Sequence, residues 1–567
     1  MQNLIQKTSD WIIFLISVAF FSAVAYETGF LPPHKFLPSI IFDYMLFSIA
    51  ALHLVFIISA REFRQYLNWR KNYRTFFLAL FLSLFLFDIQ NPTLQFALLA
   101  TKILLTLQGI ISLTSRISVL IRFRIRPPLL LAGSFSILIS IGTALLMMPN
   151  STTQSIRLVD AFFTAVSAVC VTGLIVVDTA THFTVLGKTI IFGLFQIGGF
   201  GIVLLSYFLI SLVRMNVSLQ ERIFFQEFLT TKTSTPLSQS LKMIFIFIIT
   251  IELTGTMLIW SAWFSDFPML EGFLYAAFHA VSAFCNAGFS LFSDGLMDAR
   301  ARENPTIILT IASLIFLGSI GFLTKFEVVQ KFLHFIKGRK FRLSLTSRIV
   351  LIVSVLAIIS AGGFFWLLEN NTTLAGKSTS YKALHSLFQS VTLRTAGFNT
   401  LDFSGFLPAT LLLMTIYMFI GGSSISTAGG VKINTLVAVV LSVRMTLRND
   451  TMVNIGKRRI PFQAVNKATT ILFSAFLVLL AAIIGLCITD SKLAAENLSF
   501  IIFEAVSALG TVGLSSGITP ELSDSGKLIL CIEMFVGRVG PLTMAMLLTK
   551  PEKFVDYDFP DEDFLVG

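Results

Sequence analysis

Gly510-Thr511-Val512-Gly513-Leu514 is the stretch that decides the fold, because the chain repeats this phrase in three other places. The other copies are Cys170-Val171-Thr172-Gly173-Leu174, Cys285-Asn286-Ala287-Gly288-Phe289 and Arg394-Thr395-Ala396-Gly397-Phe398. Each copy follows a short amphiphilic run and stands between two long apolar stretches. Because repetition at a regular interval marks a repeated structural unit, the sequence predicts four units. Each unit is a hydrophobic helix, a re-entrant short helix, a glycine turn and a second hydrophobic helix.

The glycine phrases have the chemistry of a filter for a dehydrated cation. Non-helical backbone at membrane depth is tolerated only where protein buries it or where it lines a watery cavity, and glycine permits positive φ without a Cβ clash. Four such loops around one axis would form rings of carbonyl oxygens, which can replace the water shell of potassium as the TVGYG loop of potassium channels does. The predicted filter residues are Val171, Thr172, Gly173, Asn286, Ala287, Gly288, Thr395, Ala396, Gly397, Thr511, Val512 and Gly513.

Composition indicates an all-α polytopic membrane protein. Of the 567 residues, 55% are hydrophobic and 13% are charged, and the mean hydropathy is +0.83. Apolar runs of about 20 residues are typical of transmembrane helices. The net charge of +11 does not indicate a nucleic-acid partner, because the excess Lys and Arg lie in short loops between predicted spans, as the positive-inside rule requires. Neither the four cysteines nor the six histidines have the spacing of a disulfide framework or a metal site, so no cofactor is expected on this chain.

The predicted organisation is an N-terminal membrane extension of about four segments, four pore repeats around one pore, and a cytoplasmic tail. Basic residues cluster in alternate loops, which places both termini in the cytoplasm and the glycine phrases toward the outside. The boundaries are 1–127 for the extension, 128–240, 241–348, 349–468 and 469–548 for the repeats, and 549–567 for the tail. The second helices are expected at 186–213, at 305–323, from Pro408 onward and at 528–548.

Acidic residues gather in the predicted outer loops, where they would concentrate cations at the mouth of a pore. For any single one of these residues, an ordinary solvated loop charge is a better explanation than a role at the pore mouth. These residues are Asp178, Asp266, Asp294, Asp298, Asp402, Asp490, Glu521 and Asp524.

The second helix of the third repeat cannot be continuous. From Pro408 to Val443 there are 36 residues, which would make a helix of roughly 54 Å, whereas the hydrocarbon layer is about 30 Å thick. A glycine- and serine-rich stretch, residues 421–430, interrupts it. We expect this stretch to break the helix and to act as a movable gate beneath the filter; the alternative is a glycine-lined helix crossing. The predicted gate residues are Gly421, Gly422, Ser423, Ser424, Gly429 and Gly430.

Two arginines lie where a cation pathway would not favour them. Arg538 stands in an apolar helix, and an ionisable group at that depth is a functional candidate by default. We expect it to face the pore opposite the gate as a barrier to cations; the alternative is a salt bridge to Glu533 or Glu252. Arg394 opens the third glycine phrase, three residues before Gly397, and we expect a buried acid such as Glu504, or carbonyls at a helix carboxyl end, to neutralise it.

Together these features resemble the Trk/Ktr/HKT superfamily of potassium transporters, and most of all the membrane subunit of the Ktr and Trk type. The resemblance covers residues 128–567 and rests on the four phrases, the break at 421–430, the sequence Gly537-Arg538-Val539-Gly540 and the final residues 557–567. It implies potassium uptake by a homodimer in the bacterial inner membrane. It also implies a cytosolic regulatory subunit of the RCK (KTN) type that binds ATP or ADP, with residues 421–430 as the gating loop and Arg538 as the partner of that loop.

The resemblance leaves some questions open. Relatives that favour sodium have a serine in place of the first filter glycine, so Gly173 favours potassium, with sodium as the other candidate ion. The sequence does not separate a gated channel from a sodium- or proton-coupled symporter. A membrane enzyme or scaffold is the rival from another class, but the predicted spans hold no converging set of catalytic groups. Residues 1–127 exceed the usual start of such subunits and receive no role from the resemblance.

Overall fold

The computed structural model describes residues 127–201 and 237–548, apart from residues 425, 451, 456 and 457, together with short stretches between residues 22 and 30. Within these ranges the chain is helical, and its strands are those of the hairpin β1 (Asn454–Ile455) and β2 (Arg458–Arg459). The predicted N-terminal extension lies almost wholly outside the described residues, and the predicted tail lies wholly outside them.

Long apolar helices begin each unit of the chain. Those that are long and apolar enough to cross a membrane number three among the described residues, or up to five if each bent helix pair counts as one span. Their outward-facing side chains are apolar, as contact with lipid requires: Ile359 of α16 is 65% exposed and Phe473 of α20 is 64% exposed. The helices that begin the units are α5 (Pro127–Leu146), α11 (Leu237–Ala262), α16 (Leu345–Glu369) and α20 (Phe462–Thr489), and the last three of them are the three that qualify singly.

A short helix follows each long one and ends at a glycine phrase. Ala161, Ala165 and Ala168 of the first short helix are fully buried, because small side chains allow the neighbouring helices to approach closely. Each short helix packs against the long helix before it. The short helices are α6 (Leu158–Val169), α12 (Met269–Cys285), α17 (Thr379–Thr392) and α22 (Leu498–Gly510).

The second helix of each unit ends early. Beyond α8 (Val185–Phe200), Gly201 has φ +74°. The helix α14 (Pro305–Ser319) meets α15 (Phe322–Ile336) at a bend of 109°, and α23 (Asp524–Val539) meets α24 (Pro541–Leu548) at 99°. The break predicted in the third unit is confirmed, because α18 (Pro408–Phe419) and α19 (Ile433–Leu447) are separate helices.

The continuous helices predicted at 305–323 and 528–548 are therefore wrong. Gly540 has φ +100° and is followed by Pro541, whose ring suits the first turn of a new helix but not the interior of an old one. In the first unit, the part of 186–213 that follows Gly201 lies outside the described residues. Breaks near the ends of the second helices are thus a general feature of the described units.

Serine and threonine side chains start several of these helices by accepting a backbone N–H of the first turn, as N-cap residues do. Thr184 caps α8, Ser344 caps α16, Ser378 caps α17 and Ser523 caps α23. Shorter elements connect the main helices: η3 (Pro149–Ser151), α7 (Thr179–His182), η4 (Gly295–Met297), α13 (Ala299–Arg302), η5 (Phe403–Gly405), α21 (Ser491–Glu496) and η6 (Thr519–Glu521).

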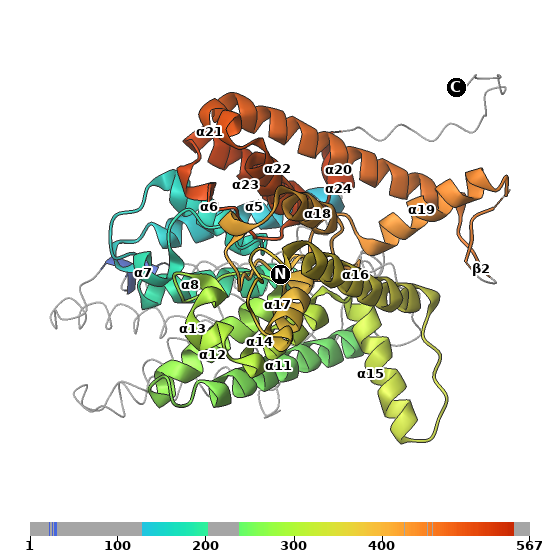
Figure 1. Ribbon diagram of the computed structural model, residues 1–567, viewed down its shortest axis with the longest axis horizontal. Helices are drawn as coiled ribbons and strands as arrows, with labels where there is room; N and C mark the ends of the chain where they lie inside the picture. The colour runs from blue at the N-terminus through green and yellow to red at the C-terminus, as the bar shows by residue number, and fades with distance from the viewer. Residues whose placement is uncertain are drawn as a thin grey trace, which may run out of the picture.

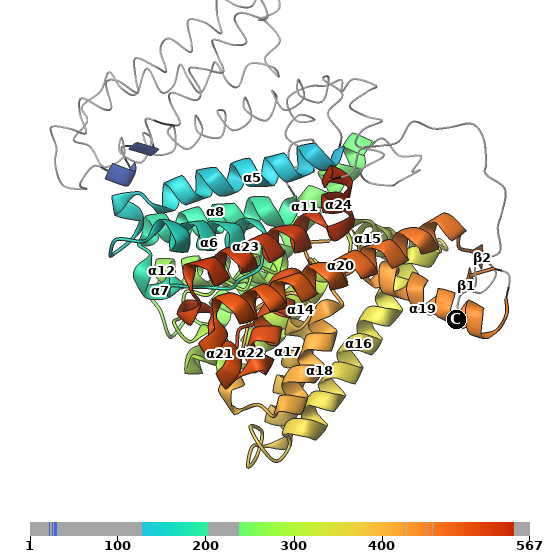
Figure 2. The same cartoon turned by 90° about the horizontal axis from the view of Figure 1, so that it is seen from above.

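The helices pack in a cyclic order. From the second unit onward, each short helix contacts the second helix of the unit before it: α12 packs on α8, α17 on α14, and α22 on α18. The cycle closes where α6, from the first unit, packs on α23, from the last, and Figures 1 and 2 show these two helices close together. The middle of the molecule is therefore surrounded by segments that lie far apart in the sequence.

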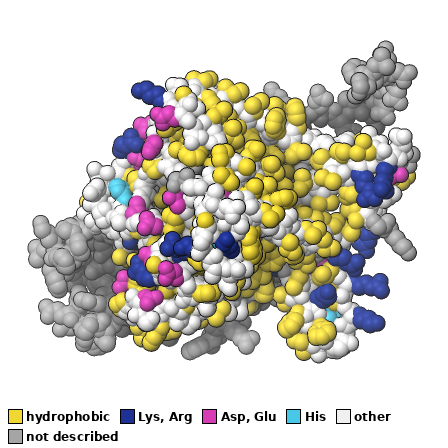
Figure 3. Space-filling model, viewed as in Figure 1, with side chains coloured by type: hydrophobic (Ala, Val, Ile, Leu, Met, Phe, Trp, Pro, Cys, Tyr) yellow, Lys and Arg dark blue, Asp and Glu magenta, His cyan; other side chains and the backbone are white. Residues whose placement is uncertain are grey.

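Charge is divided between two ends of the molecule. Figure 3 shows hydrophobic side chains over the middle of the face, acidic side chains interspersed with Lys and Arg toward one end, and mainly Lys and Arg at the opposite end over α15 and β2. An apolar band between two polar ends is the pattern of a membrane-spanning protein.

Candidate functional site

The four glycine phrases share one backbone conformation. Each has positive φ at its glycine and at the residue two places before it. Five non-glycine residues in the described part of the chain have positive φ, and four of them are these positions: Val171 (58°), Asn286 (60°), Thr395 (64°) and Thr511 (49°). Such a conformation costs about 1–3 kcal/mol and persists only where the surroundings impose it. The same strain at four matched positions indicates a functional site.

The phrases face one another in a closed ring. A Cβ built on Gly173 would lie 2.5 Å from the carbonyl oxygen of Ala287, and one built on Gly288 would lie 2.9 Å from that of Ala396. A Cβ built on Gly397 would lie 2.8 Å from the carbonyl oxygen of Val512. The ring closes because a Cβ built on Gly513 would overlap the carbonyl oxygen of Thr172. Glycine is therefore required at all four positions.

The carbonyl oxygens before the glycines are available to a ligand. The N–H groups of the same residues are already engaged, since Thr172 N donates to Ser167 O at 2.8 Å and Val512 N donates to Ser507 O at 2.8 Å. The N–H groups of Ala287 and Ala396 bond backward in the same way. Within the described part of the chain, no backbone N–H bonds to the carbonyl oxygens of Thr172, Ala287, Ala396 or Val512. Such free carbonyls can coordinate a cation.

Hydroxyl side chains of the short helices hold the phrases in place, and sequence reasoning gave them no role. Ser167 Oγ accepts from Gly173 N at 3.0 Å, and Ser507 Oγ accepts from Gly513 N at 3.1 Å. Ser282 and Thr392 instead donate to the carbonyl oxygens that follow their glycines, at 2.8 and 2.7 Å. The signal was present in the sequence, because three of the short helices carry a serine six residues before the glycine.

The predicted gate forms a buried loop against the glycine phrases. We call residues 420–432 the glycine-serine loop; its ends are joined by a bridge between Ile420 and Val431. Ser423 is buried, and its N–H donates to Ser319 O at 3.1 Å. A Cβ built on Gly429 would overlap the hydroxyl of Thr511 in the fourth phrase. The loop therefore touches both the end of α14 and the ring of phrases.

Arg538 connects the glycine-serine loop to the first unit. Its guanidinium donates to the carbonyl oxygen of Thr427 in the loop and to that of Gly198 in α8. The alternative partners do not bind it: Glu252 accepts from the Gln196 amide at 3.1 and 3.2 Å, and Glu533 has no hydrogen-bond partner among the described residues. Arg538 thus lies beside the loop and is held by backbone carbonyls.

Two lysines near the loop were missed as site residues. Lys325 lies after the apolar stretch of the second unit, where the pattern of alternating basic loops predicts a cytoplasmic charge, but it is only 4% exposed. Its Nζ donates to Gly318 O at 3.1 Å and lies 4.8 Å from the Phe284 ring. Lys432 Nζ donates to Ala428 O at 2.6 Å and to Gly429 O at 3.1 Å. Together with Arg538 they place three basic side chains around the loop.

The neutralisation of Arg394 by Glu504 was predicted wrongly. Glu504 accepts hydrogen bonds from Ser515, Ser516 and Thr519 instead. The terminal nitrogens of the Arg394 guanidinium are buried and have no hydrogen-bond partner among the described residues, carbonyls included.

The acids of the predicted outer loops form specific local contacts. Asp178 accepts from Ser293 at 2.6 Å and from Thr181 at 2.7 Å; partial burial acts to raise its pKa, but these hydrogen bonds bring the pKa below its ordinary value. The hydrogen bond and charge of Arg300 likewise lower the pKa of Asp298. These carboxylates are therefore ionised at neutral pH. Among the described residues, no group of three or more His, Cys, Asp or Glu side chains could hold a metal ion.

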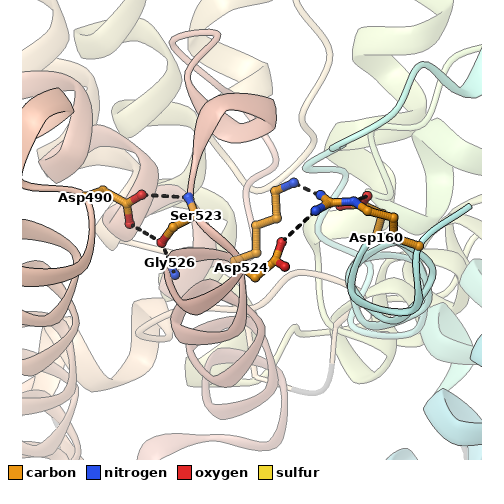
Figure 4. A network of polar contacts seen from close by, with 7 residues as sticks. Asp160, Asp490, Ser523, Asp524 and Gly526 are labelled. Carbon is orange, nitrogen blue, oxygen red and sulfur yellow. Dashed lines mark hydrogen bonds and ion pairs between the residues drawn. The ribbon is translucent and has the colours of Figure 1, made fainter.

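An ion-pair network closes the cycle of units between α6 and α23 (Figure 4). Lys527 Nζ bonds to Asp160 Oδ1 at 2.9 Å, and both side chains are more than nine-tenths buried. Arg157 bonds to Asp160 at 2.8 Å and to Asp524 at 3.1 Å. In the same network Asp490 accepts from the N–H of Ser523 at 2.6 Å. The first and last units are thus joined by charge where no chain connection joins them.

Replacing Lys527 with Met should lower the melting temperature of the purified protein. The change leaves Asp160 buried with only the exposed Arg157 as its partner, and a broken buried pair costs about 3 kcal/mol or more. The double variant Asp160→Leu with Lys527→Met should recover most of the loss, because it removes both charges. Equal melting temperatures for the wild type and Lys527→Met would show that this pair does not hold the units together.

Comparisons with known proteins give a consistent result. The family model for TrkH, described as a cation transport protein, matches residues 114–557. Ktr system potassium uptake protein B of Bacillus subtilis (strain 168) is 38% identical over 447 residues, which are 78% of this chain and 97% of that protein. The protein of the same name from Vibrio alginolyticus is 36% identical over 443 residues, or 78% and 95% of the two chains.

Two further comparisons bear on the ion and on the fold. The potassium/sodium uptake protein NtpJ of Enterococcus hirae is 33% identical over 454 residues, covering 79% of this chain and 98% of that protein. The crystal structure of the potassium transporter TrkH from Vibrio parahaemolyticus matches with a TM-score of 0.60, covering 97% of this chain and 98% of that chain at 17% identity. At this level of identity, the structural match concerns the fold alone.

Proposed function

The chain belongs to the TrkH family of cation transport proteins, and from this premise we propose that it takes up potassium across the bacterial inner membrane. The ion passes through four phrases, residues 171–173, 286–288, 395–397 and 511–513, whose backbone carbonyls form the selectivity filter. The four units are pore repeats around one axis. No chemical reaction takes place on the chain; the filter replaces the water shell of the ion.

The closed ring of glycine contacts is the observation that carries this proposal. Each glycine is close to a carbonyl of the next phrase, and the last returns to the first. Four loops that meet in this way present carbonyls around a common axis, which is the geometry that a dehydrated monovalent cation needs. The names of the potassium uptake relatives at 38% and 36% identity support the same ion.

The glycine-serine loop is the proposed gate. It is buried beneath the phrases, Arg538 holds it to α8, and Lys325 and Lys432 add positive charge around it. For cations to pass, the loop must move and the arginine must release its carbonyls. Because the Ktr relatives are named as parts of a system, we further propose a homodimer regulated by a cytosolic subunit of the RCK (KTN) type that binds ATP or ADP. Both termini are cytoplasmic in this proposal.

A second candidate function is sodium- or proton-coupled potassium symport. This candidate is supported by the relative at 33% identity, which is named as a potassium/sodium uptake protein. A pH gradient or sodium gradient that drives uphill rubidium uptake would distinguish the symporter from a channel, which only equilibrates the ion.

The proposal is tested by rubidium uptake into proteoliposomes that hold the purified chain, with potassium or sodium as competitor. Uptake that potassium suppresses strongly and sodium weakly is expected. If no uptake appears with the chain alone, adding a cytosolic nucleotide-binding ring with ATP tests whether the regulatory subunit is obligatory. Uptake that neither ion suppresses would contradict the filter.

Gly173→Ser should weaken the preference for potassium over sodium. The added Cβ meets the carbonyl oxygen of Ala287, and φ of +95° is unfavourable for serine, so the first loop must shift and the ring must change its size. The measurement is the ratio of potassium to sodium concentrations that halve rubidium uptake. An unchanged ratio in the folded variant would remove this loop from the filter.

A further inference from the structure

Asn286 is the residue of the second phrase whose side chain reaches the glycine-serine loop. We propose that its amide couples the position of this loop to the alignment of the phrases, so that Asn286 is a positioning residue for ion passage. The inference rests on the proposed function and deepens it, because it assigns the contact through which gate and filter act on each other.

The Asn286 amide joins three segments. Its Nδ2 donates to the carbonyl oxygen of Arg394, at the start of the third phrase, at 3.0 Å. Its Oδ1 accepts from Thr427 Oγ1 in the glycine-serine loop at 3.1 Å. The side chain has no solvent exposure, so both bonds are made in a low-dielectric setting where an unpaired polar atom is costly. The two partners are complementary to the amide, since a carbonyl accepts and a hydroxyl can donate.

The contact is particular to the second unit. The matched positions hold Val171, Thr395 and Thr511; valine has no polar side-chain atom, and the hydroxyls of both threonines have no hydrogen-bond partner among the described residues. Space for the longer amide comes from Gly318 of α14, because a Cβ built there would overlap Asn286 Oδ1. Among the described residues, the cyclic arrangement is therefore broken at one side chain, which points to the glycine-serine loop between α18 and α19.

Movement of the loop must change the surroundings of this amide. When Thr427 leaves, Oδ1 loses its donor, and a buried acceptor without a partner carries the full cost of desolvation. The amide can then keep its bond to the third phrase only at that cost, or turn away and release the Arg394 carbonyl. Loop position and filter alignment are thus linked, and linkage is reciprocal: an ion that favours one filter alignment also favours one loop position.

The test uses rubidium uptake by the full chain in proteoliposomes, with potassium and sodium as competitors. Thr427→Val keeps the shape of the side chain and removes the hydroxyl, so it should raise uptake roughly two- to tenfold and also change the potassium-to-sodium ratio. Thr427→Ser keeps the hydroxyl and should restore the wild-type ratio. The matched control is Thr415→Val, since this buried α18 hydroxyl bonds to Leu412 O of its own helix at 2.6 Å.

A double-variant cycle isolates the coupling. If the amide transmits the effect, Asn286→Leu with Thr427→Val should change uptake no more than Asn286→Leu alone. The coupling would be overturned if the effects of the two substitutions on uptake were additive, or if Thr427→Val and Thr415→Val had the same potassium-to-sodium ratio. Either result would leave the filter proposal intact. A wild-type protein without potassium-competed uptake would overturn the proposed function itself. If Asn286→Leu fails to fold, the comparison of Thr427→Val with Thr427→Ser tests the coupling instead, because Thr427 lies outside the phrases. The same change of the potassium-to-sodium ratio in both variants would contradict the coupling.

Discussion

Gly513→Ala is expected to reduce potassium-competed rubidium uptake to the level of protein-free vesicles. A Cβ at this position overlaps the carbonyl oxygen of Thr172 and lies 3.0 Å from the Cα of Gly173. Both neighbours are backbone atoms, so no side chain can turn away to make room. The φ of +86° at Gly513 adds about 1–2 kcal/mol of strain for any residue with a Cβ. The Thr172 carbonyl must therefore move, and the ring loses one of its ligands.

The control for Gly513→Ala is Gly193→Ala in α8. A Cβ at Gly193 has no atom within 4 Å, and replacing a helical glycine with alanine stabilises a helix by about 1 kcal/mol. This variant should conduct as the wild type does. Size-exclusion profiles of both proteins show whether they are folded. A monodisperse Gly513→Ala protein that conducts normally and selects potassium would refute the assignment of the fourth phrase to the filter.

Arg538→Ala is expected to raise rubidium uptake on the order of tenfold or more. The guanidinium makes charge-assisted bonds to Thr427 O and Gly198 O, and one such bond contributes about 1.5–3 kcal/mol. Without it the glycine-serine loop loses its anchor to α8, and a positive charge beside the cation pathway disappears. Deletion of residues 423–427 should act in the same direction, because it removes the loop itself.

The comparison variants for Arg538→Ala separate charge from anchoring. Arg538→Lys keeps the charge but cannot reach two carbonyls with a planar fork, so its uptake should lie between those of the wild type and the alanine variant. Arg444→Ala, at an exposed position in the last turn of α19, should leave uptake unchanged. Unchanged or lower uptake in a folded Arg538→Ala protein would contradict the role of this residue as a barrier.

The sequence was sufficient for the features that depend on local pattern. The four phrases, the short helices before them and the break after Pro408 follow from repetition, hydropathy and helix length. The breaks near Ser319 and Gly540 were missed because the apolar sequence continues across each of them, whereas the structure bends there by 109° and 99°. A Gly-Pro pair at 540–541 was the available signal.

Partners of buried charges could not be predicted, because they depend on contacts across units. Lys325 follows the apolar stretch of the second unit, where the charge pattern predicts a basic loop, yet it is buried against Phe284 from another helix. Glu504 had no obvious local partner in the sequence, yet hydroxyls of the following turn satisfy it. Asn286 looked like one more filter residue, and only the packing around Gly318 shows that its side chain leaves the ring.

The contact between the first and last phrases has a consequence for biosynthesis. Gly173 and Gly513 are neighbours in the ring but are separated by 340 residues of chain. At a synthesis rate of about 5–20 residues per second, the first loop waits roughly 20 to 70 seconds for its neighbour to emerge. During that interval its carbonyls have a partner loop on one side at most. A chain that stalls before the fourth unit therefore presents an open, polar edge to lipid, which is a surface that quality-control proteases and insertion chaperones can recognise.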